Sequence, residues 1–190
     1  MKHCGTQRIE TERLILRQFS VDDADAMYRN WASDSEVVKY LTWTAHADVD
    51  VSREVLKDWV SSYMQKDYYQ WAIVLKENGN DPIGSISAVK VNDDIDMVHI
   101  GYCMGRAWWH QGIMSEAAQA VIAFFFDRVC ANSVCSYHDP NNPYSGMVMK
   151  HCGMKYEGTR RAADRHNTGI CDASWYSILR AEAVSERYQG

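Results

Sequence analysis

The spacing of hydrophobic and polar residues in the first third of the chain predicts one strand followed by helices. Residues 9–18 (IETERLILRQ) have the pattern of a strand. The segment from Ser20 to Asp23 has the spacing of a capping box, with Asp in place of Glu, and opens an amphipathic helix. Apolar residues at helical steps predict a short helix near 37–41 and a longer one around 50–66. The apolar positions of that longer helix are Val55, Leu56, Trp59, Tyr63 and Met64.

The middle of the chain changes to a period of two. Residues 69–75 alternate as a strand does, and turn signals at 77–80 and 92–94 separate the strands that follow. Three strands in a row predict an antiparallel meander. The other expected elements are strands at 83–91 and 96–104, a helix at 113–128, a strand at 133–138, a short helix at 143–152, and strands at 154–162 and 170–180. This order predicts a mixed α/β (α+β) fold.

Length and composition fit one folded domain. The chain has 190 residues, of which 46% are hydrophobic and 24% are charged. These values exclude disordered, collagen-like and low-complexity chains. We therefore expect a single domain over 1–190, with its core at about 9–183.

The net charge and the hydropathy narrow the range of partners. The formal charge is −5, so the chain lacks the overall charge of a nucleic-acid binder. No apolar run approaches the roughly 18 residues of a membrane span, and the longest, 117–126, has the pattern of a buried helix. The N-terminus has no apolar region of the kind found in signal peptides. We expect a cytoplasmic protein, monomeric or homodimeric, with neither nucleic acid nor membrane as a partner.

The six cysteines form no recognisable motif. They include no C-x-x-C pair, and no group of Cys and His has the spacing of a zinc site. Free thiols in a reducing compartment explain them most simply, and no metal site is expected. Four basic residues near the C-terminus form a patch that we interpret as a solvated face. They are Arg160, Arg161, Arg165 and His166.

The loop from Gly105 to Gly112 joins a predicted strand to a predicted helix. Its glycines allow close backbone approach, and no Ser, Thr, Asp or Asn precedes Ile113 to cap the helix. An external anion could take the place of the cap, which makes the loop a candidate phosphate cradle. The alternative is a plain turn in which Ser115 caps the helix.

A second loop enters the next helix at Asn142-Pro143. Asn at the N-cap followed by Pro at the first helical position is a strong start signal, and Gly153 ends the helix. Ser145 lies in the first turn. The simplest interpretation gives Asn142 a capping role only.

Seven phrases occur in order along the chain. They are 10–17 (ETERLILR), 83–86 (IGSI), 100–102 (IGY), 108–117 (WWHQGIMSEA), 142–145 (NPYS), 152–158 (CGMKYEG), and Asp172 before 176–180 (YSILR). In this order they resemble the GNAT superfamily of N-acetyltransferases, most of all the branch that acetylates the N-termini of ribosomal proteins. The resemblance implies a GNAT-like acyl-CoA N-acyltransferase fold, a largely antiparallel, splayed sheet of about seven strands flanked by helices.

The resemblance also implies acetyl-CoA as co-substrate. The family's pyrophosphate loop maps onto 109–114, where Gly112 matches while Trp109 and Met114 depart from the pattern. Arg106 or His110 could replace the missing cation. The residues expected to bind the cofactor are Tyr102, Cys103, Met104, Arg106, His110, Gln111, Gly112, Ile113, Met114, Ser115, Asn142 and Ser145.

By this resemblance, a primary amine attacks the acetyl thioester directly. Many relatives supply the acid from a tyrosine at the position of Met149, and Ser145 takes that role in the branch that this chain resembles. The base is His138 or Asp172, with water as the alternative. An acyl-enzyme on Cys103 is chemically possible but is not the family's usual route.

The acceptor is expected to be cationic. The resemblance implies that the first two helices and the 170-region hairpin wall the acceptor side. These segments carry several carboxylates: Asp22, Asp23, Asp25, Asp34, Glu36 and Asp172. Together with the net charge, they favour an amine, and short turns favour an open groove for a peptide α-amine. The alternatives are a small amine such as an antibiotic or polyamine, and a non-catalytic acyl-CoA-binding module.

Overall fold

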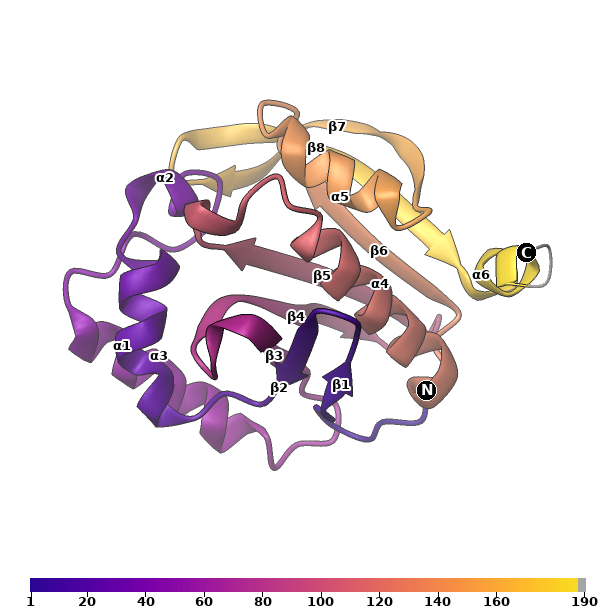
Figure 1. The fold of residues 1–190 in the computed structure, drawn as a ribbon. Coiled ribbons are helices and arrows are strands. Elements are labelled where there is room, and N and C mark those ends of the chain that lie inside the picture. Colours follow the sequence, from indigo (N-terminus) through magenta and orange to yellow (C-terminus); the bar gives the residue numbers. More distant parts are fainter. Residues whose placement is uncertain (188–190) are drawn as a thin grey trace.

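A single eight-stranded sheet organises the chain. The structure is a computed structural model that describes residues 1–187, with side chains up to residue 183 (Figure 1). The strands are Ile9–Glu10 (β1), Leu14–Arg17 (β2), Gln70–Leu75 (β3), Pro82–Asn92 (β4), Met97–Met104 (β5), Ser133–His138 (β6), Lys155–His166 (β7) and Gly169–Leu179 (β8). The α-helices are Ala24–Met27 (α1), Ser35–Val38 (α2), Val49–Ser62 (α3), Ile113–Phe124 (α4), Pro143–His151 (α5) and Arg180–Arg187 (α6).

The strand order is β1-β2-β3-β4-β5-β6-β8-β7. All neighbours are antiparallel except β5 and β6, which are parallel and joined through α4. The predicted meander of β3, β4 and β5 and the mixed α/β class are both confirmed. Figure 1 shows β8 lying between β6 and β7, so the last two strands enter the sheet in reverse order.

The segment predicted as one strand over 9–18 is a hairpin of two short strands. Ile9 pairs with Leu16 across a turn in which the backbone N–H of Leu14 donates to the Thr11 hydroxyl. The Glu116 carboxylate of α4 accepts hydrogen bonds from both the Thr11 hydroxyl, at 2.5 Å, and the Arg13 backbone N–H. The turn therefore depends on a residue about a hundred positions away.

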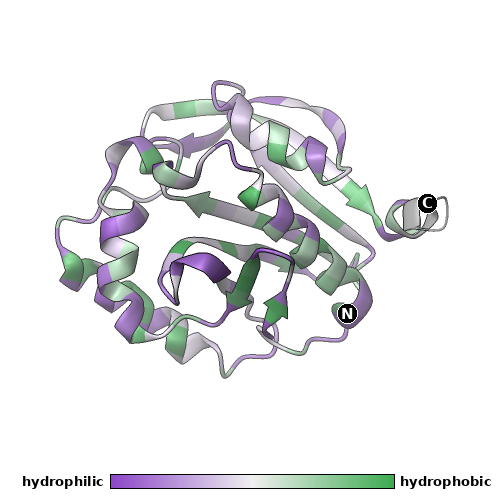
Figure 2. Cartoon of the chain, in the orientation of Figure 1, coloured by the Kyte–Doolittle hydropathy of each residue, from purple (hydrophilic) through white to green (hydrophobic). Residues whose placement is uncertain are grey.

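Both faces of the sheet are covered. On one face, α4 packs on a core that includes Trp71, Ile86 and Phe125. On the other, α1 and α3 lie side by side and bury Trp31 and Leu56. Hydrophobic residues accordingly gather on the central strands and on α4 (Figure 2). This arrangement explains why every residue of β3 is buried.

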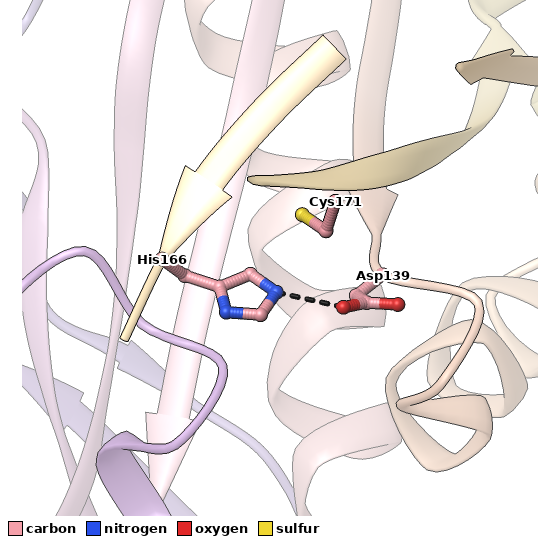
Figure 3. Close-up of side chains that lie close together, drawn as sticks. All are labelled: Asp139, His166 and Cys171. Atoms are coloured by element: carbon pink, nitrogen blue, oxygen red, sulfur yellow. Dashed lines mark hydrogen bonds and ion pairs between the residues drawn. The ribbon is translucent and has the colours of Figure 1, made fainter. Parts of the chain in front are cut away.

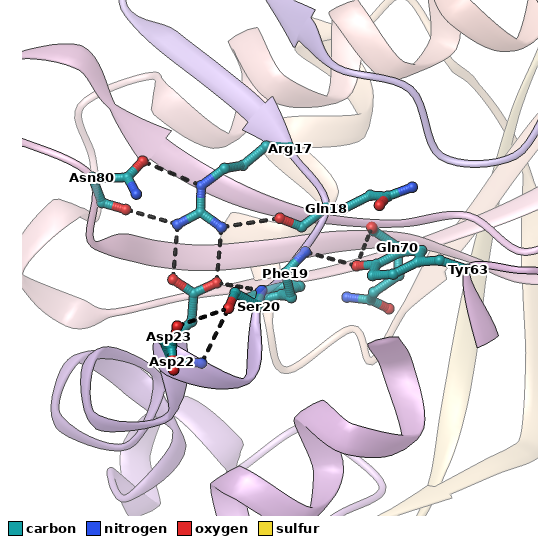
Figure 4. A network of polar contacts seen from close by, with 9 residues as sticks. All are labelled: Arg17, Gln18, Phe19, Ser20, Asp22, Asp23, Tyr63, Gln70 and Asn80. Atoms are coloured by element: carbon teal, nitrogen blue, oxygen red, sulfur yellow. Dashed lines mark hydrogen bonds and ion pairs between the residues drawn. The ribbon is translucent and has the colours of Figure 1, made fainter. Parts of the chain in front are cut away.

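The entry to α1 is fixed by a polar network around Arg17 (Figure 4). The predicted capping box is present, because the Ser20 hydroxyl accepts from the Asp22 N–H and the Asp23 carboxylate accepts from the Ser20 N–H. The Asp23 carboxylate also accepts hydrogen bonds from Nη1 and Nη2 of the Arg17 guanidinium, each at 2.8 Å. Arg17 also donates a hydrogen bond to the Asn80 carbonyl at 2.8 Å, which connects β2 to the turn before β4.

The third predicted helix is shorter than its apolar pattern indicated. Helix α3 ends at Ser62, and Met64 is 90% exposed and not part of an apolar face. Tyr63 is the C-cap residue of α3, and its hydroxyl accepts from the Phe19 N–H and donates to the Gln70 carbonyl, both at 2.9 Å.

Strands β5 and β6 pair only at their first three residues, from Met97 opposite Ser133 to His99 opposite Cys135. Just beyond, the Ser136 hydroxyl donates to the Ile100 carbonyl at 2.8 Å. After that point β5 keeps only β4 as a partner and β6 keeps only β8. The sheet therefore opens into a cleft toward the carboxyl ends of both strands.

All six cysteines have free thiols, as expected. Within residues 1–187, no helix combines the length and the apolar character needed to cross a membrane. Helix α6, which follows β8 directly, was not predicted from the sequence.

Candidate active site

The cleft between β5 and β6 holds a cavity of about 530 Å³. This volume lies within the range of roughly 300–1,000 Å³ that is usual for small-molecule sites. Four segments line the cavity: the end of β5, the loop into α4, the loop into α5, and α2 with the residues that follow it. Two candidate loops from the sequence thus meet in one place.

The N-terminus of α4 is open toward this cavity. The helix begins at Ile113, and its N-cap is Gly112 at φ 72° with no capping side chain, so the interpretation of Ser115 as the cap is wrong. A Cβ at Gly112 would lie 3.7 Å from the Arg13 guanidinium and within 4 Å of no other surrounding side chain, so the space above the glycine is unfilled. Unpaired amides and the helix dipole at such a position suit a phosphate group.

The side chains of the loop before α4 divide into two groups. His110 and Trp109 line the cavity, and the His110 ring packs edge-on against Tyr144 of α5, with ring centroids 4.5 Å apart. Arg106 and Gln111 are not among the lining residues. The Arg106 guanidinium pairs with the Asp34 carboxylate at 2.5 Å, and the Gln111 amide donates to the Ala107 carbonyl. Of the two proposed substitutes for the missing cation, only His110 is in place.

Tyr102, Cys103 and Met104 of β5 all line the cavity. Because successive N–H groups of a strand point to opposite edges, Tyr102 and Met104 share one edge and Cys103 donates on the other. The Cys103 thiol lies 3.4 Å from the Ser85 hydroxyl, and burial raises its pKa. A thiol whose pKa is raised stays protonated, which does not favour an acyl-enzyme.

The first turn of α5 faces the end of β5. Asn142 is the N-cap residue and Pro143 follows it as predicted, but the Asn142 side chain makes no capping hydrogen bond and lines the cavity. Ser145 also lines it. The Tyr102 hydroxyl donates to the Ser145 carbonyl at 2.9 Å, and the Ser145 hydroxyl donates to Tyr102 at 3.3 Å. Sequence reasoning considered only the backbone of Tyr102 and missed its hydroxyl.

Neither candidate base is among the cavity-lining residues. His138 donates from Nδ1 to the Asp139 carbonyl at 2.8 Å, and its other nitrogen is packed against Gly146 of α5. Asp172 accepts from the Ala162 N–H at 2.9 Å and so holds an irregular point of β7. The geometry does not support either residue as the base. Met149, at the position where many relatives have the acid tyrosine, is buried in the core and does not line the cavity.

Of the carboxylates expected to face the acceptor, one lines the cavity. Asp23 pairs with Arg17 and Asp34 pairs with Arg106, so neither offers an uncompensated charge to an acceptor. Of the six carboxylates named from the sequence, only Glu36 of α2 lines the cavity, where it is exposed. An attraction for a cationic amine at this site therefore depends on Glu36.

Residues 38–43, which follow Glu36, form the rest of the acceptor wall. Hydrogen bonds from the β7–β8 turn hold them in place. The Asn167 side chain donates to the Val38 carbonyl at 2.9 Å and to the Trp43 carbonyl at 2.8 Å, and its N–H donates to the Leu41 carbonyl. Because Leu41 lines the cavity, the position of this wall depends on the turn. Sequence reasoning did not identify Asn167, which is distant in sequence and matches no motif.

Comparison with known proteins agrees with this arrangement. A family profile described as an acetyltransferase (GNAT) domain matches residues 13–155. The chain belongs to the GNAT acetyltransferase family. It is 28% identical over 176 residues to p20 of Bacillus licheniformis, an uncharacterized N-acetyltransferase, covering 93% of this chain and 98% of that protein.

Solved structures of other GNAT proteins have the same fold. An acetyltransferase of the family from Bacillus anthracis has a TM-score of 0.81 at 26% identity, covering 93% of this chain and 100% of that one. RimL, a ribosomal L7/L12 alpha-N-protein acetyltransferase solved with coenzyme A, has a TM-score of 0.81 at 18% identity. The match covers 91% of this chain and 98% of the RimL chain. The splayed sheet implied by the sequence phrases is thus confirmed.

The GNAT chain is an acetyl-CoA-dependent acetyltransferase, and its residues fit that co-substrate. The glycine at the start of α4 leaves room that a Cβ would take, and the uncapped helix end suits the pyrophosphate. When bound, acetyl-CoA supplies the activated acetyl group. The alternative prediction of a non-catalytic acyl-CoA-binding module is therefore wrong.

Proposed function

We propose that this GNAT acetyltransferase transfers the acetyl group of acetyl-CoA to the α-amine of a peptide or protein N-terminus. The observation that carries the proposal is the acceptor wall, residues 38–43 after α2, which Asn167 holds in place next to the exposed, cavity-lining carboxylate of Glu36. A preformed wall beside an exposed carboxylate suits a chain end that enters from outside, whereas a small amine is usually enclosed. RimL, which has the same fold, is named for an alpha-N-protein substrate.

In the proposed reaction the neutral amine nitrogen attacks the thioester carbonyl carbon. The carbonyl oxygen becomes an oxyanion, which a backbone N–H at the end of β5 stabilises. Collapse of this intermediate breaks the carbon–sulfur bond and forms the amide. The leaving thiolate takes one proton, and the amine nitrogen loses one.

We assign the proton for the thiolate to the Ser145 hydroxyl, and solvent water returns a proton to the Ser145 oxygen to complete the cycle. Its bond to Tyr102 is 3.3 Å long, beyond the usual 2.5–3.0 Å of such bonds, so the hydroxyl can rotate toward sulfur at little cost. Burial raises the pKa of Tyr102 well above its usual range, so Tyr102 stays protonated and acts on Ser145 by positioning it. Water carries the amine proton away, since neither candidate base lines the cavity.

A competition assay tests the acceptor. N-terminal peptides, lysine side chains, polyamines and aminoglycosides are offered at equal concentration with acetyl-CoA, and the products are separated by mass spectrometry. We expect acetylation at the peptide α-amine. A matched peptide blocked at its N-terminus and containing lysine should remain unmodified, and preference for a small amine would replace this proposal with the small-molecule alternative.

Glu36→Gln gives a second readout of the same site. The substitution keeps the size of the side chain and removes its charge, so we expect a higher KM for the amine with an unchanged KM for acetyl-CoA. Asp22→Asn is the control, because Asp22 is an exposed acid that does not line the cavity. Equal amine KM values for wild type and Glu36→Gln would remove Glu36 from the acceptor site.

A further inference from the structure

Three side chains with different donor atoms converge behind the acceptor wall. They are Asp139 at the end of β6, His166 at the end of β7 and Cys171 in β8 (Figure 3). Their ligand atoms all lie within 4.8 Å of one another. The side chains of Asp139 and His166 are each 2% exposed, so His166 is not part of the solvated basic face predicted from the sequence.

The hydrogen bonds of His166 define its present tautomer. The Thr168 backbone N–H donates to Nδ1 at 3.3 Å, so the ring proton is on Nε2, which donates to the Asp139 carboxylate at 2.7 Å. The Thr168 hydroxyl also lies 3.1 Å from Nδ1 and can accept a hydrogen bond from it. The ring therefore has a partner ready for the opposite tautomer, in which Nε2 offers its lone pair.

We propose that Asp139, His166 and Cys171 bind a soft divalent cation of the zinc class. Imidazole nitrogen, thiolate sulfur and carboxylate oxygen are the donor types that zinc takes in proteins, and three of them leave a fourth position for water. Cys171 is partly exposed and gives the ion a route from solvent.

The distances require only small movements. Zinc holds these donors at about 2.0–2.3 Å, which places tetrahedral neighbours about 3.3–3.8 Å apart. The Asp139 and His166 atoms would separate slightly from 2.7 Å, and the sulfur would move inward by about 1 Å from the outer limit of 4.8 Å. Side-chain rotation is enough for both changes.

The proton balance is simple. On binding, the Cys171 thiol releases its proton to solvent, and the His166 proton moves from Nε2 to Nδ1, where the Thr168 hydroxyl accepts its hydrogen bond. The negative surroundings favour a cation here. The carboxylates of Asp139, Asp164 and Asp172 surround the Cys171 sulfur with negative charge, which a divalent ion offsets.

An ion at this position links three segments that support the acceptor wall. The other Asp139 oxygen accepts from the Asn141 backbone N–H at 2.7 Å, and the Asn141 carbonyl accepts from the Tyr40 hydroxyl at 3.0 Å. Both Asn141 and Tyr40 line the cavity. The bound cation thus stiffens the wall from behind without touching the cofactor.

Titration of the chelator-treated protein with Co²⁺ tests the proposal. We expect a single ion per chain and a near-ultraviolet absorption band from thiolate-to-cobalt charge transfer, which Zn²⁺ abolishes by displacement. Cys171→Ser should lose the band, while Cys130→Ser, at a cysteine outside the cluster, should keep it. Thr168→Val should keep the band and weaken affinity by about 10–100-fold.

Thermal unfolding with and without Zn²⁺ gives a readout that does not depend on activity. Zn²⁺ should raise the Tm of wild type and of Cys130→Ser but not that of Cys171→Ser. A wild-type protein with no thiolate band at saturating Co²⁺, or a band that persists in Cys171→Ser, would overturn the assignment. Cys171→Ser is a small change at a partly exposed position, so the test does not depend on His166 variants that fail to fold.

Discussion

Single residues in the cleft act through conformation and partners as much as through side-chain type. Gly112 adopts a φ of 72° at the start of α4. Most other L-residues lose roughly 1–2 kcal/mol in this left-handed region. Ser145 has an ordinary conformation, and its proton is held only by a long bond to Tyr102. These two residues can therefore be tested by small substitutions.

Gly112→Ala should weaken coenzyme A binding by about tenfold or more, equivalent to about 1.4 kcal/mol. The methyl group strains the backbone and enters the space next to the helix amides, although it meets no close atom of the protein itself. Calorimetry measures the affinity and circular dichroism checks the fold. Gly79→Ala is the matched control, since Gly79 has a φ of 78° with open space around it. Unchanged affinity in a folded Gly112→Ala protein would remove the phosphate cradle from α4.

Ser145→Ala should lower kcat by roughly 10²–10⁴ while changing the KM for acetyl-CoA little. The reason is that a proton donor acts in the transition state and contributes little to ground-state binding. Steady-state kinetics measures both constants. Ser61→Ala, which removes an exposed hydroxyl bonded to the Asp58 carbonyl within α3, serves as control. A kcat within about twofold of wild type would show that another group protonates the thiolate.

At the scale of elements, the β7–β8 turn acts as a clamp on the connection between α2 and α3. The clamp depends on the side-chain amide of Asn167, which reaches two backbone carbonyls of that connection. Each such bond stabilises by about 0.5–1.5 kcal/mol. The acceptor wall is therefore fixed by an element from the opposite end of the chain.

Asn167→Ala should raise the KM for the amine acceptor without raising the KM for acetyl-CoA. Loss of the amide loosens the wall at 38–43, whereas β5 and the α4 N-terminus are not touched by it. Initial rates at varied amine and acetyl-CoA concentrations separate the two effects. Asn92→Ala, at the distant β4–β5 turn, is the control because it removes a side-chain hydrogen bond from another turn, where Asn92 accepts from the Asp94 N–H. Equal amine KM values would mean that the wall does not need the clamp.

The sequence predicts elements well where local pattern decides them. Strand β6, the start of α5 at Pro143 and the capping box at Ser20 all follow from short-range rules, and each is found as predicted. The 9–18 segment was predicted incorrectly because Glu116 of α4 fixes its turn. Local alternation carries no information about such a distant partner.

The same limit applies to the site. The loops at Gly112 and Asn142 were identified because glycine and proline leave local signals. Asn167 and the Asp139–His166–Cys171 cluster were not, because their partners come from three different strands or turns. His138 was assigned to the site from its place at a strand end, but its ring faces α5. The direction in which a side chain points depends on tertiary contacts, which a local sequence pattern does not show.

At the scale of the whole molecule, the two halves of the sheet meet at His99. This residue is the last of β5 to pair with β6, and its ring lies against those of Tyr137 and Trp175, at 4.9 Å and 5.7 Å between centroids. Burial lowers the pKa of His99 to about 4. The folded chain therefore holds this histidine neutral at the junction of the two halves.

Stability should fall as the pH is lowered from about 6.5 toward 4. In this window the unfolded chain binds a proton at His99 and the folded chain does not, so the free energy of unfolding decreases by at most about 1.4 kcal/mol per pH unit. Urea unfolding at several pH values measures this slope. His99→Gln should flatten it, whereas His151→Gln, at an exposed histidine, should not. Equal slopes in wild type and His99→Gln would assign the acid sensitivity to other groups.

The position of β8 between β6 and β7 has a consequence during synthesis on the ribosome. Strand β7 leaves the ribosome first, yet its sheet neighbour among the described strands is β8, so its pairing waits for residues 169–177, which emerge later. An unpaired nascent strand is an aggregation hazard, and charged residues are a common protection. The arginines of β7, Arg160, Arg161 and Arg165, are exposed, and their like charges disfavour pairing of this strand with the same strand of another chain before β8 arrives.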